Sequence, residues 1–164
     1  MAFIQKLSRS VAESNSTLCV GLDPNLDLLP STIKKEFESP EEQVLEFCKQ
    51  VVDATQDFCA AYKPNIAFFE ALGARGLDVF EKVLAHIPSS KIVIVDAKRG
   101  DISSTAEHYE KAFFQKFDVD AITLNPLMGF DTLKAFSSHE SKAIYVLTLT
   151  SNPGAADFLK QAFF

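Results

Sequence analysis

The sequence lacks any run of 18 consecutive apolar residues, and its first residues, Met1 to Lys6, contain no long apolar segment. The first absence argues against a membrane-spanning helix, and the second argues against a secretory signal peptide. Cations are also few, because 16 Lys and Arg residues face 22 Asp and Glu residues, for a net charge of −6. We therefore expect no nucleic-acid partner and no attraction to an anionic membrane.

Cysteines and histidines are too sparse to build a disulfide framework or a metal site. The three cysteines are odd in number and include no Cys-x-x-Cys pair: Cys19, Cys48 and Cys59. Such a set is typical of reduced, mostly buried thiols in a cytoplasmic protein. The three histidines stand singly along the chain, so the sequence gives no support for a structural metal.

Linkers and low-complexity tracts are absent as well, and 164 residues of ordinary globular composition predict a single domain over 1–164. Short, almost continuously apolar segments alternate with segments of helical spacing. The first kind predicts strands buried on both faces, at 17–22, 58–63, 91–96, 121–125 and 143–148. The second kind predicts helices at 41–56, 70–86, 104–117 and 130–138, with another beginning near 155. Residues 104–107 (STAE) suggest a capping box for the third of these helices.

A repeated strand-then-helix pattern predicts an α/β fold with a parallel sheet. The chain has no GxGxxG or Walker loop, and polar side chains follow almost every predicted strand, which favours a (β/α)8 TIM barrel over an open doubly wound sheet. Such barrels need at least about 200 residues. We therefore expect the N-terminal portion of a barrel, with about five of the eight βα units and with exposed apolar faces, Phe163 and Phe164 among them.

Charged side chains stand at the ends of the first three predicted strands. Strand residues two apart point to the same face, so Asp96 and Lys98 should share a face at the end of the third strand. By the same parity, Lys63 and Asp23 end the second and first strands. If these strands are neighbours in the sheet, their charged side chains should meet in one pocket of alternating Lys and Asp. The alternative for Asp96 and Lys98 alone is a solvated salt bridge in a loop.

Five strand-end motifs together resemble the orotidine 5'-phosphate decarboxylase suprafamily, in the right order, over about residues 17–158. The segment 96–102 (DAKRGDI) is similar to the DxKxxD signature of that suprafamily. The other four are 20–25 (VGLDPN), 62–70 (YKPNIAFFE), 123–129 (TLNPLMG) and 149–154 (LTSNPG). The sequences of the AKRGDI and SNPG segments are similar to those of the longer bacterial branch of the decarboxylase family.

The resemblance implies a cofactor-free and metal-free loss of CO2 from orotidine 5'-monophosphate, which gives uridine 5'-monophosphate in pyrimidine biosynthesis. It makes Lys98 the cation beside the reacting carbon and the proton donor to it. Asp96 would lie against the substrate carboxylate. Lys63 would position Asp96 and the ribose, and Asp23 would bind a ribose hydroxyl.

The same resemblance implies a homodimer with shared active sites. Asp101 and Thr105 would reach the substrate site of the partner, which completes a Lys-Asp-Lys-Asp array. Ser151 would contact the pyrimidine, and Asn125 joins the substrate-binding set at the end of the fourth strand.

Two other functions stay open. Metal-dependent sugar-phosphate decarboxylases and aldolases of the suprafamily hold Mg²⁺ with a carboxylate at the end of the second strand, where this chain has Lys63. The chain can also be an inactive fragment that only folds or dimerises, because phosphate is usually held after strands seven and eight. The other cations near loops, Arg75, Arg99 and Lys160, are expected to be solvated surface groups.

Overall fold

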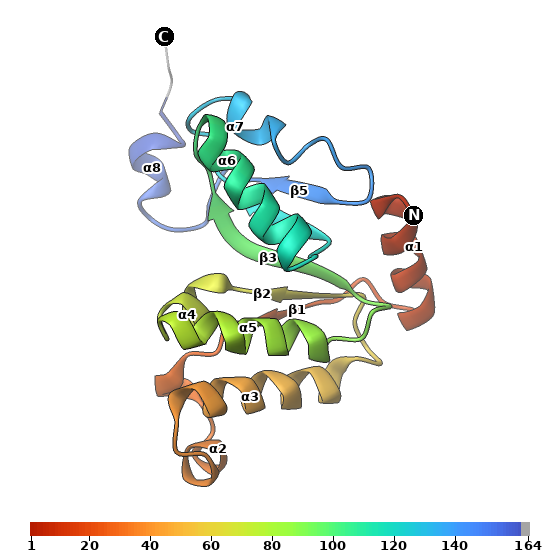
Figure 1. Ribbon diagram of the computed structural model, residues 1–164, viewed down its shortest axis with the longest axis vertical. Helices are drawn as coiled ribbons and strands as arrows, with labels where there is room; N and C mark the ends of the chain where they lie inside the picture. The colour runs from red at the N-terminus through yellow and green to blue at the C-terminus, as the bar shows by residue number, and fades with distance from the viewer. Residues whose placement is uncertain (162–164) are drawn as a thin grey trace.

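A computed structural model describes residues 1–161 and contains one sheet of five parallel strands (Figure 1). The strands are β1 Cys19–Leu22, β2 Ala61–Pro64, β3 Ile92–Arg99, β4 Ala121–Leu124 and β5 Ala143–Val146. They lie across the sheet in chain order, from β1 to β5. A doubly wound sheet reverses its order at a switch point, whereas this uninterrupted order is that of a barrel arc. All five predicted strands are confirmed.

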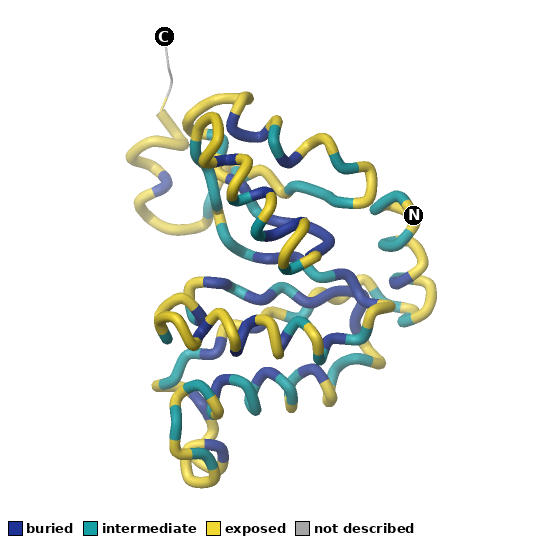
Figure 2. Tube along the Cα trace, in the orientation of Figure 1, coloured by how far each residue is buried: buried dark blue, intermediate teal, exposed yellow. Residues whose placement is uncertain are grey.

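Helical segments follow each of the strands, and the longer ones pack on the outer face of the sheet (Figure 1). The helical segments are η1 Leu26–Leu28, α2 Ser31–Glu36, α3 Pro40–Thr55, α4 Ile66–Glu70, α5 Ala74–His86, α6 Ser103–Glu110, the π-helix η2 Lys111–Lys116, α7 Asp131–Lys134 and α8 Ala155–Phe158. Alternate strand residues, such as Leu22, Tyr62 and Val95, meet the apolar stripes of these helices in the main core. Figure 2 shows this core as the buried inner sides of α3 and α5 facing buried strands.

Helix α1 (Phe3–Ser14) covers the end of the sheet at which the strands begin (Figure 1). Its Phe3 and Leu7 pack against a second cluster, which lines the inner face of the sheet: Ala61, Ile92, Ile94 and Ala121. Ser10 Oγ also donates a 2.7 Å hydrogen bond to the Ala60 carbonyl. No helix was expected at the N-terminus, although Phe3, Leu7 and Val11 recur at helical spacing and were a usable signal.

Two details of the predicted helices are wrong. The segment 70–86 is not one helix, because Gly73 at φ +70° separates α4 from α5. The capping box expected at 104–107 does not form, since α6 begins at Ser103 and Ser104 already lies inside it. A capping box is present instead at Ser39 and Glu42, before α3. Residue type alone does not decide which of several Ser positions begins a helix; the path of the preceding chain does.

Apolar side chains are exposed along the two outermost strands, as expected of part of a barrel. Leu18 before β1 is 50% exposed and Tyr145 in β5 is 43% exposed, and neither strand has a second neighbour within residues 1–161. Phe163 and Phe164 lie outside the described residues, and one domain over 1–164 stays a prediction. No helix within 1–161 is both long and apolar enough to cross a membrane.

Candidate active site

Two lysines converge on one carboxylate at the carboxyl edge of the sheet. Lys98 Nζ lies 2.5 Å from Asp96 Oδ1, and Lys63 Nζ lies 3.3 Å from Asp96 Oδ2. Each oxygen of Asp96 therefore binds a different ammonium. The Asp96 side chain is only 13% exposed, so the alternative of a solvated loop salt bridge does not describe it, whereas the Lys98 side chain is 51% exposed.

Strand β3 carries a bulge at the point where these groups meet. Val95 pairs with Ile122, but the next pair joins Arg99 to Leu124, so residues 96–98 lie opposite Thr123 alone. Lys98 adopts φ +48°, which is uncommon for a residue other than glycine. The expectation that Asp96 and Lys98 share a face assumed a regular strand, and this assumption is wrong between Val95 and Arg99. The two side chains meet because the bulge redirects Lys98.

The hydroxyl of Thr123 contacts three groups of this bulge. Thr123 Oγ1 accepts hydrogen bonds from the backbone N–H of Ala97 at 3.0 Å and of Lys98 at 2.9 Å. It donates to Asp96 Oδ1 at 3.0 Å. No role was expected for Thr123, because a threonine within a strand is ordinary strand composition. Only the register of β3 against β4 brings it to the site.

Opposing effects set the pKa of Asp96. Partial burial raises this pKa, but hydrogen bonds from Lys98 and Thr123 and the charges of Lys63 and Lys98 lower it. The lowering effects win, and the pKa lies below its usual value of 3.8. Asp96 is therefore ionised at neutral pH, as a carboxylate between two ammonium groups should be.

Asp23 lies beside this cluster and is held by a neighbour that was not singled out. Asn65 Nδ2 donates to Asp23 Oδ1 at 2.9 Å, while Asn65 Oδ1 caps α4 by accepting from Ala67 N at 3.2 Å. Asn65 also forms a parallel bridge with Asp96. The ends of β1, β2 and β3 thus form one row, in which Asp23 is fixed at the edge and exposed to the concave face.

Arg99 is not the solvated surface group that was expected. Its guanidinium forms an ion pair with Glu70 at the end of α4 and lies 5.3 Å from the ring centroid of Tyr109. The side chain is 21% exposed, and its Nε is buried without a hydrogen-bond partner among residues 1–161. Arg75 and Lys160 are exposed, as predicted. Arg99 therefore anchors the segment after Lys98 to the outer helices and points away from the concave face.

The other predicted site residues do not join the Lys-Asp-Lys cluster within the described residues. Asp101 Oδ1 accepts from Ile102 N at 2.8 Å, and Thr105 is exposed on α6. Asn125 is exposed after β4, where its Oδ1 accepts from Leu127 N. Ser151 is exposed in the segment between β5 and α8. Asn125 and Ser151 lie at the carboxyl side of the sheet, as the cluster does.

Comparison with known proteins agrees with this arrangement of strand ends. Residues 16–163 match the model of the orotidine 5'-phosphate decarboxylase / HUMPS family. The chain belongs to this family. An orotidine 5'-phosphate decarboxylase of Leptospira interrogans is 44% identical over 99% of the chain, and one of Phocaeicola vulgatus is 41% identical over 94%.

Solved structures of family members share the fold. The OMP decarboxylase of Leishmania donovani matches 96% of the chain at 38% identity with a TM-score of 0.82. The UMP synthase of the same organism matches 100% of the chain at 36% identity with a TM-score of 0.85. The chain spans 59% of the Leptospira interrogans protein and 56% of the Phocaeicola vulgatus protein. The orotidine 5'-phosphate decarboxylase family fold, a TIM barrel, is therefore present as a five-stranded portion.

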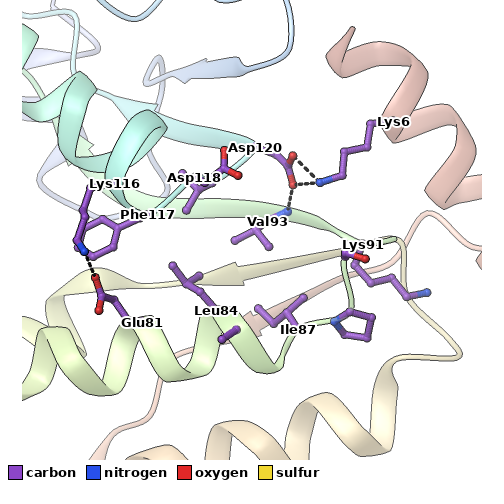
Figure 3. Close-up of a pocket in the computed structure, with 14 residues that line it drawn as sticks. Lys6, Glu81, Leu84, Ile87, Lys91, Val93, Lys116, Phe117, Asp118 and Asp120 are labelled. Carbon is purple, nitrogen blue, oxygen red and sulfur yellow. Dashed lines mark hydrogen bonds and ion pairs between the residues drawn. The ribbon is translucent and has the colours of Figure 1, made fainter. Parts of the chain in front are cut away.

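A cleft of about 480 Å³ lies at the opposite end of the strands in this family member (Figure 3). Four of its charged side chains form two ion pairs: Lys6 pairs with Asp120 at 2.6 Å, and Lys116 pairs with Glu81 at 3.3 Å. Lys91 donates to the Cys59 carbonyl, and Asp118 pairs with Lys142. Catalytic groups of barrels collect at the carboxyl ends of the strands, whereas the opposite end serves stability. This cleft is therefore not the candidate active site.

Proposed function

We propose that the cluster of Lys63, Asp96 and Lys98 belongs to an orotidine 5'-phosphate decarboxylase, which converts orotidine 5'-monophosphate to uridine 5'-monophosphate without a cofactor. The observation that carries this proposal is Lys98, whose side chain is half exposed while Asp96 holds its ammonium at 2.5 Å. Family membership and the names of the relatives support the same reaction.

The chemistry needs a fixed cation at the carbon that loses CO2. Departure of CO2 leaves an electron pair on the pyrimidine carbon, and an ammonium already in place stabilises that negative charge. Lys98 then delivers a proton to the same carbon, as a positioned general acid. Asp96 holds Lys98 in place and lies where the substrate carboxylate would approach. Lys63 neutralises the second oxygen of Asp96 and positions it.

The remaining assignments concern substrate binding and a dimer. Asp23, held by Asn65, would bind a ribose hydroxyl, Ser151 would contact the pyrimidine, and Asn125 would be a further substrate-binding residue. In this proposal Asp101 and Thr105 act in the site of a partner subunit. Support comes from Asp101, which forms no hydrogen bond or ion pair with the Lys-Asp-Lys cluster of its own chain within residues 1–161.

A magnesium-dependent sugar-phosphate reaction of the same family is the weaker candidate. The Lys63 ammonium lies 3.3 Å from Asp96 Oδ2, on the oxygen that a cation would otherwise use. A second cation at that oxygen would face strong repulsion. Loss of activity in EDTA would favour the metal-dependent reaction, and unchanged activity would favour the decarboxylase.

A location of the protein in the cytoplasm stays a prediction.

A chimera tests the proposal, because the relatives are longer than this chain. Residues 1–158 would be joined to the corresponding C-terminal part of the Leptospira interrogans protein, and the loss of orotidine 5'-monophosphate would be followed by absorbance. We expect turnover that Lys98→Ala lowers by more than about 100-fold with the fold intact. Lys82→Ala, on the exposed side of α5, is the matched control and should leave turnover unchanged. A folded chimera without turnover would contradict the proposal.

A further inference from the structure

The bulge in β3 leaves two backbone amides without strand partners. In a regular parallel pair every second residue of β3 would hydrogen-bond to the backbone of β4, but residues 96–98 face the single residue Thr123. A half-buried N–H that loses its partner costs free energy, so the amide of Ala97, whose hydrogen bond is part-buried, needs another acceptor, whereas the amide of Lys98 is at an exposed position. The amides of Ala97 and Lys98 both find it in Thr123 Oγ1, at 3.0 and 2.9 Å.

We infer that Thr123 is a positioning residue, whose hydroxyl fixes the backbone of Ala97 and Lys98 and, at the same time, the carboxylate of Asp96. This inference rests on the proposed function, because it concerns the same ammonium and carboxylate. A hydroxyl has one proton and two lone pairs. Thr123 uses both lone pairs on the amides, so its proton is committed to Asp96 Oδ1 at 3.0 Å.

The consequence is a coupling between the backbone and the carboxylate. Asp96 Oδ1 accepts two hydrogen bonds, one from the Thr123 hydroxyl and one from the Lys98 ammonium. The backbone of Lys98 is held at φ +48° by the same hydroxyl that orients its carboxylate partner. A loss of the hydroxyl should therefore affect the amides of Ala97 and Lys98 and the ionisation of Asp96 together. If Thr123 only filled space, its replacement by valine would change neither these two amides nor the ionisation of Asp96.

The test uses NMR on the 164-residue chain and needs no turnover. The carboxyl carbon of Asp96, assigned by its loss in Asp96→Asn, is titrated in wild type, Thr123→Val and Thr123→Ser. Valine keeps the branched shape without the hydroxyl, and serine keeps the hydroxyl. We expect the pKa of Asp96 to rise in Thr123→Val and to stay near wild type in Thr123→Ser. Amide exchange at Ala97 and Lys98 should accelerate about tenfold in the valine variant only.

Thr132→Val is the matched control, because Thr132 Oγ1 donates to the Gly129 carbonyl at 2.8 Å, away from the cluster. It should leave both readouts at Asp96 and Lys98 unchanged. Equal Asp96 titration in wild type and Thr123→Val would overturn the inference. So would fast exchange of the Ala97 and Lys98 amides in wild type, a result that needs no folded variant. Failure of the proposed function would instead appear as a folded chimera that does not turn over orotidine 5'-monophosphate.

Discussion

Asp96 depends on its neighbours for its charge. Burial alone would favour its neutral form, and two ammonium groups and one hydroxyl reverse that preference. Removing any one of Lys63, Lys98 or Thr123 should therefore raise the pKa of Asp96. Each of these three partners contacts Asp96 through a polar atom.

The pH dependence of stability should report this balance. Because the pKa of Asp96 is lower in the folded chain than its usual value of 3.8, its charge stabilises the fold above about pH 4. That contribution is lost as the pH falls through the lowered pKa. In urea unfolding between about pH 5 and pH 2, the stability of wild type should fall toward that of Asp96→Asn. A constant difference between the two would contradict this, and Asp78→Asn on α5 is the surface control.

At the scale of elements, the end of β3 is locked against the segment that follows β4. Asn125 N donates to the Arg99 carbonyl at 2.7 Å, and a Cβ on Gly100 would lie 2.6 Å from the Asn125 carbonyl oxygen. Arg99 adds an outer anchor through Glu70 and Tyr109. The bulge that presents Lys98 is thus held on both sides by backbone and side-chain contacts.

Gly100→Ala should disturb this junction. Its methyl group would meet the Asn125 backbone, which cannot move aside as a flexible side chain does, so we expect a loss of about 1–3 kcal/mol in the free energy of unfolding. Gly154→Ala is the matched control, because its nearest atoms would be 3.4 Å away and its change should stay within about 0.5 kcal/mol. Chemical denaturation of both variants measures this, and equal stabilities would refute the close approach.

Helix α1 should contribute to stability through its contact with the sheet. Ser10 is 1% exposed and its Oγ donates to the Ala60 carbonyl at 2.7 Å. Ser10→Ala should cost about 1 kcal/mol relative to Ser8→Ala, which changes an exposed serine on the same helix. The comparison cancels the common gain in helix propensity. If both variants unfold at the same denaturant concentration, the contact of α1 with β2 contributes nothing measurable.

At the scale of the whole molecule, the described chain is a five-stranded arc whose concave face holds the charged cluster. The relatives continue beyond the matched region, and barrels usually bind phosphate after strands seven and eight. Binding energy from a remote phosphate can lower the barrier of the reaction as well as raise affinity.

A polypeptide of these 164 residues alone should therefore turn over orotidine 5'-monophosphate far more slowly than the chimera. In the proposed function the Lys-Asp-Lys cluster supplies the reacting centre, whereas the phosphate of the substrate would be held after strands seven and eight of a barrel. Steady-state rates of the two proteins at equal concentration measure the difference. Near-equal rates would show that the arc binds phosphate by itself, with the exposed Arg75 and Lys160 as the first cations to substitute.

The proposed shared sites predict that inactive variants complement each other in mixed dimers. In a mixed dimer, Lys98→Ala of one subunit and Asp101→Asn of the other would fall in the same site, so the second site stays native. Equal mixing of the two chimeric variants should restore roughly one quarter of wild-type turnover, because half of the dimers are mixed. Each variant alone is the control. No recovery after confirmed subunit exchange would argue that Asp101 acts within its own chain.

The sequence by itself was enough for the strand segments, the barrel class and the residues of the cluster. Continuous apolar runs and strand-end charges are local patterns, which depend on residue type and spacing. The cover by α1 and the roles of Asn65 and Arg99 came only from the tertiary structure, because they rest on contacts between residues far apart in the chain. The same holds for Thr123 and Lys98. Regular strand parity predicts that Lys98 lies beside Asp96, but the two side chains meet for a different reason. The register of β3 against β4 creates a bulge, and Thr123 accepts hydrogen bonds from the amides that the bulge leaves without strand partners.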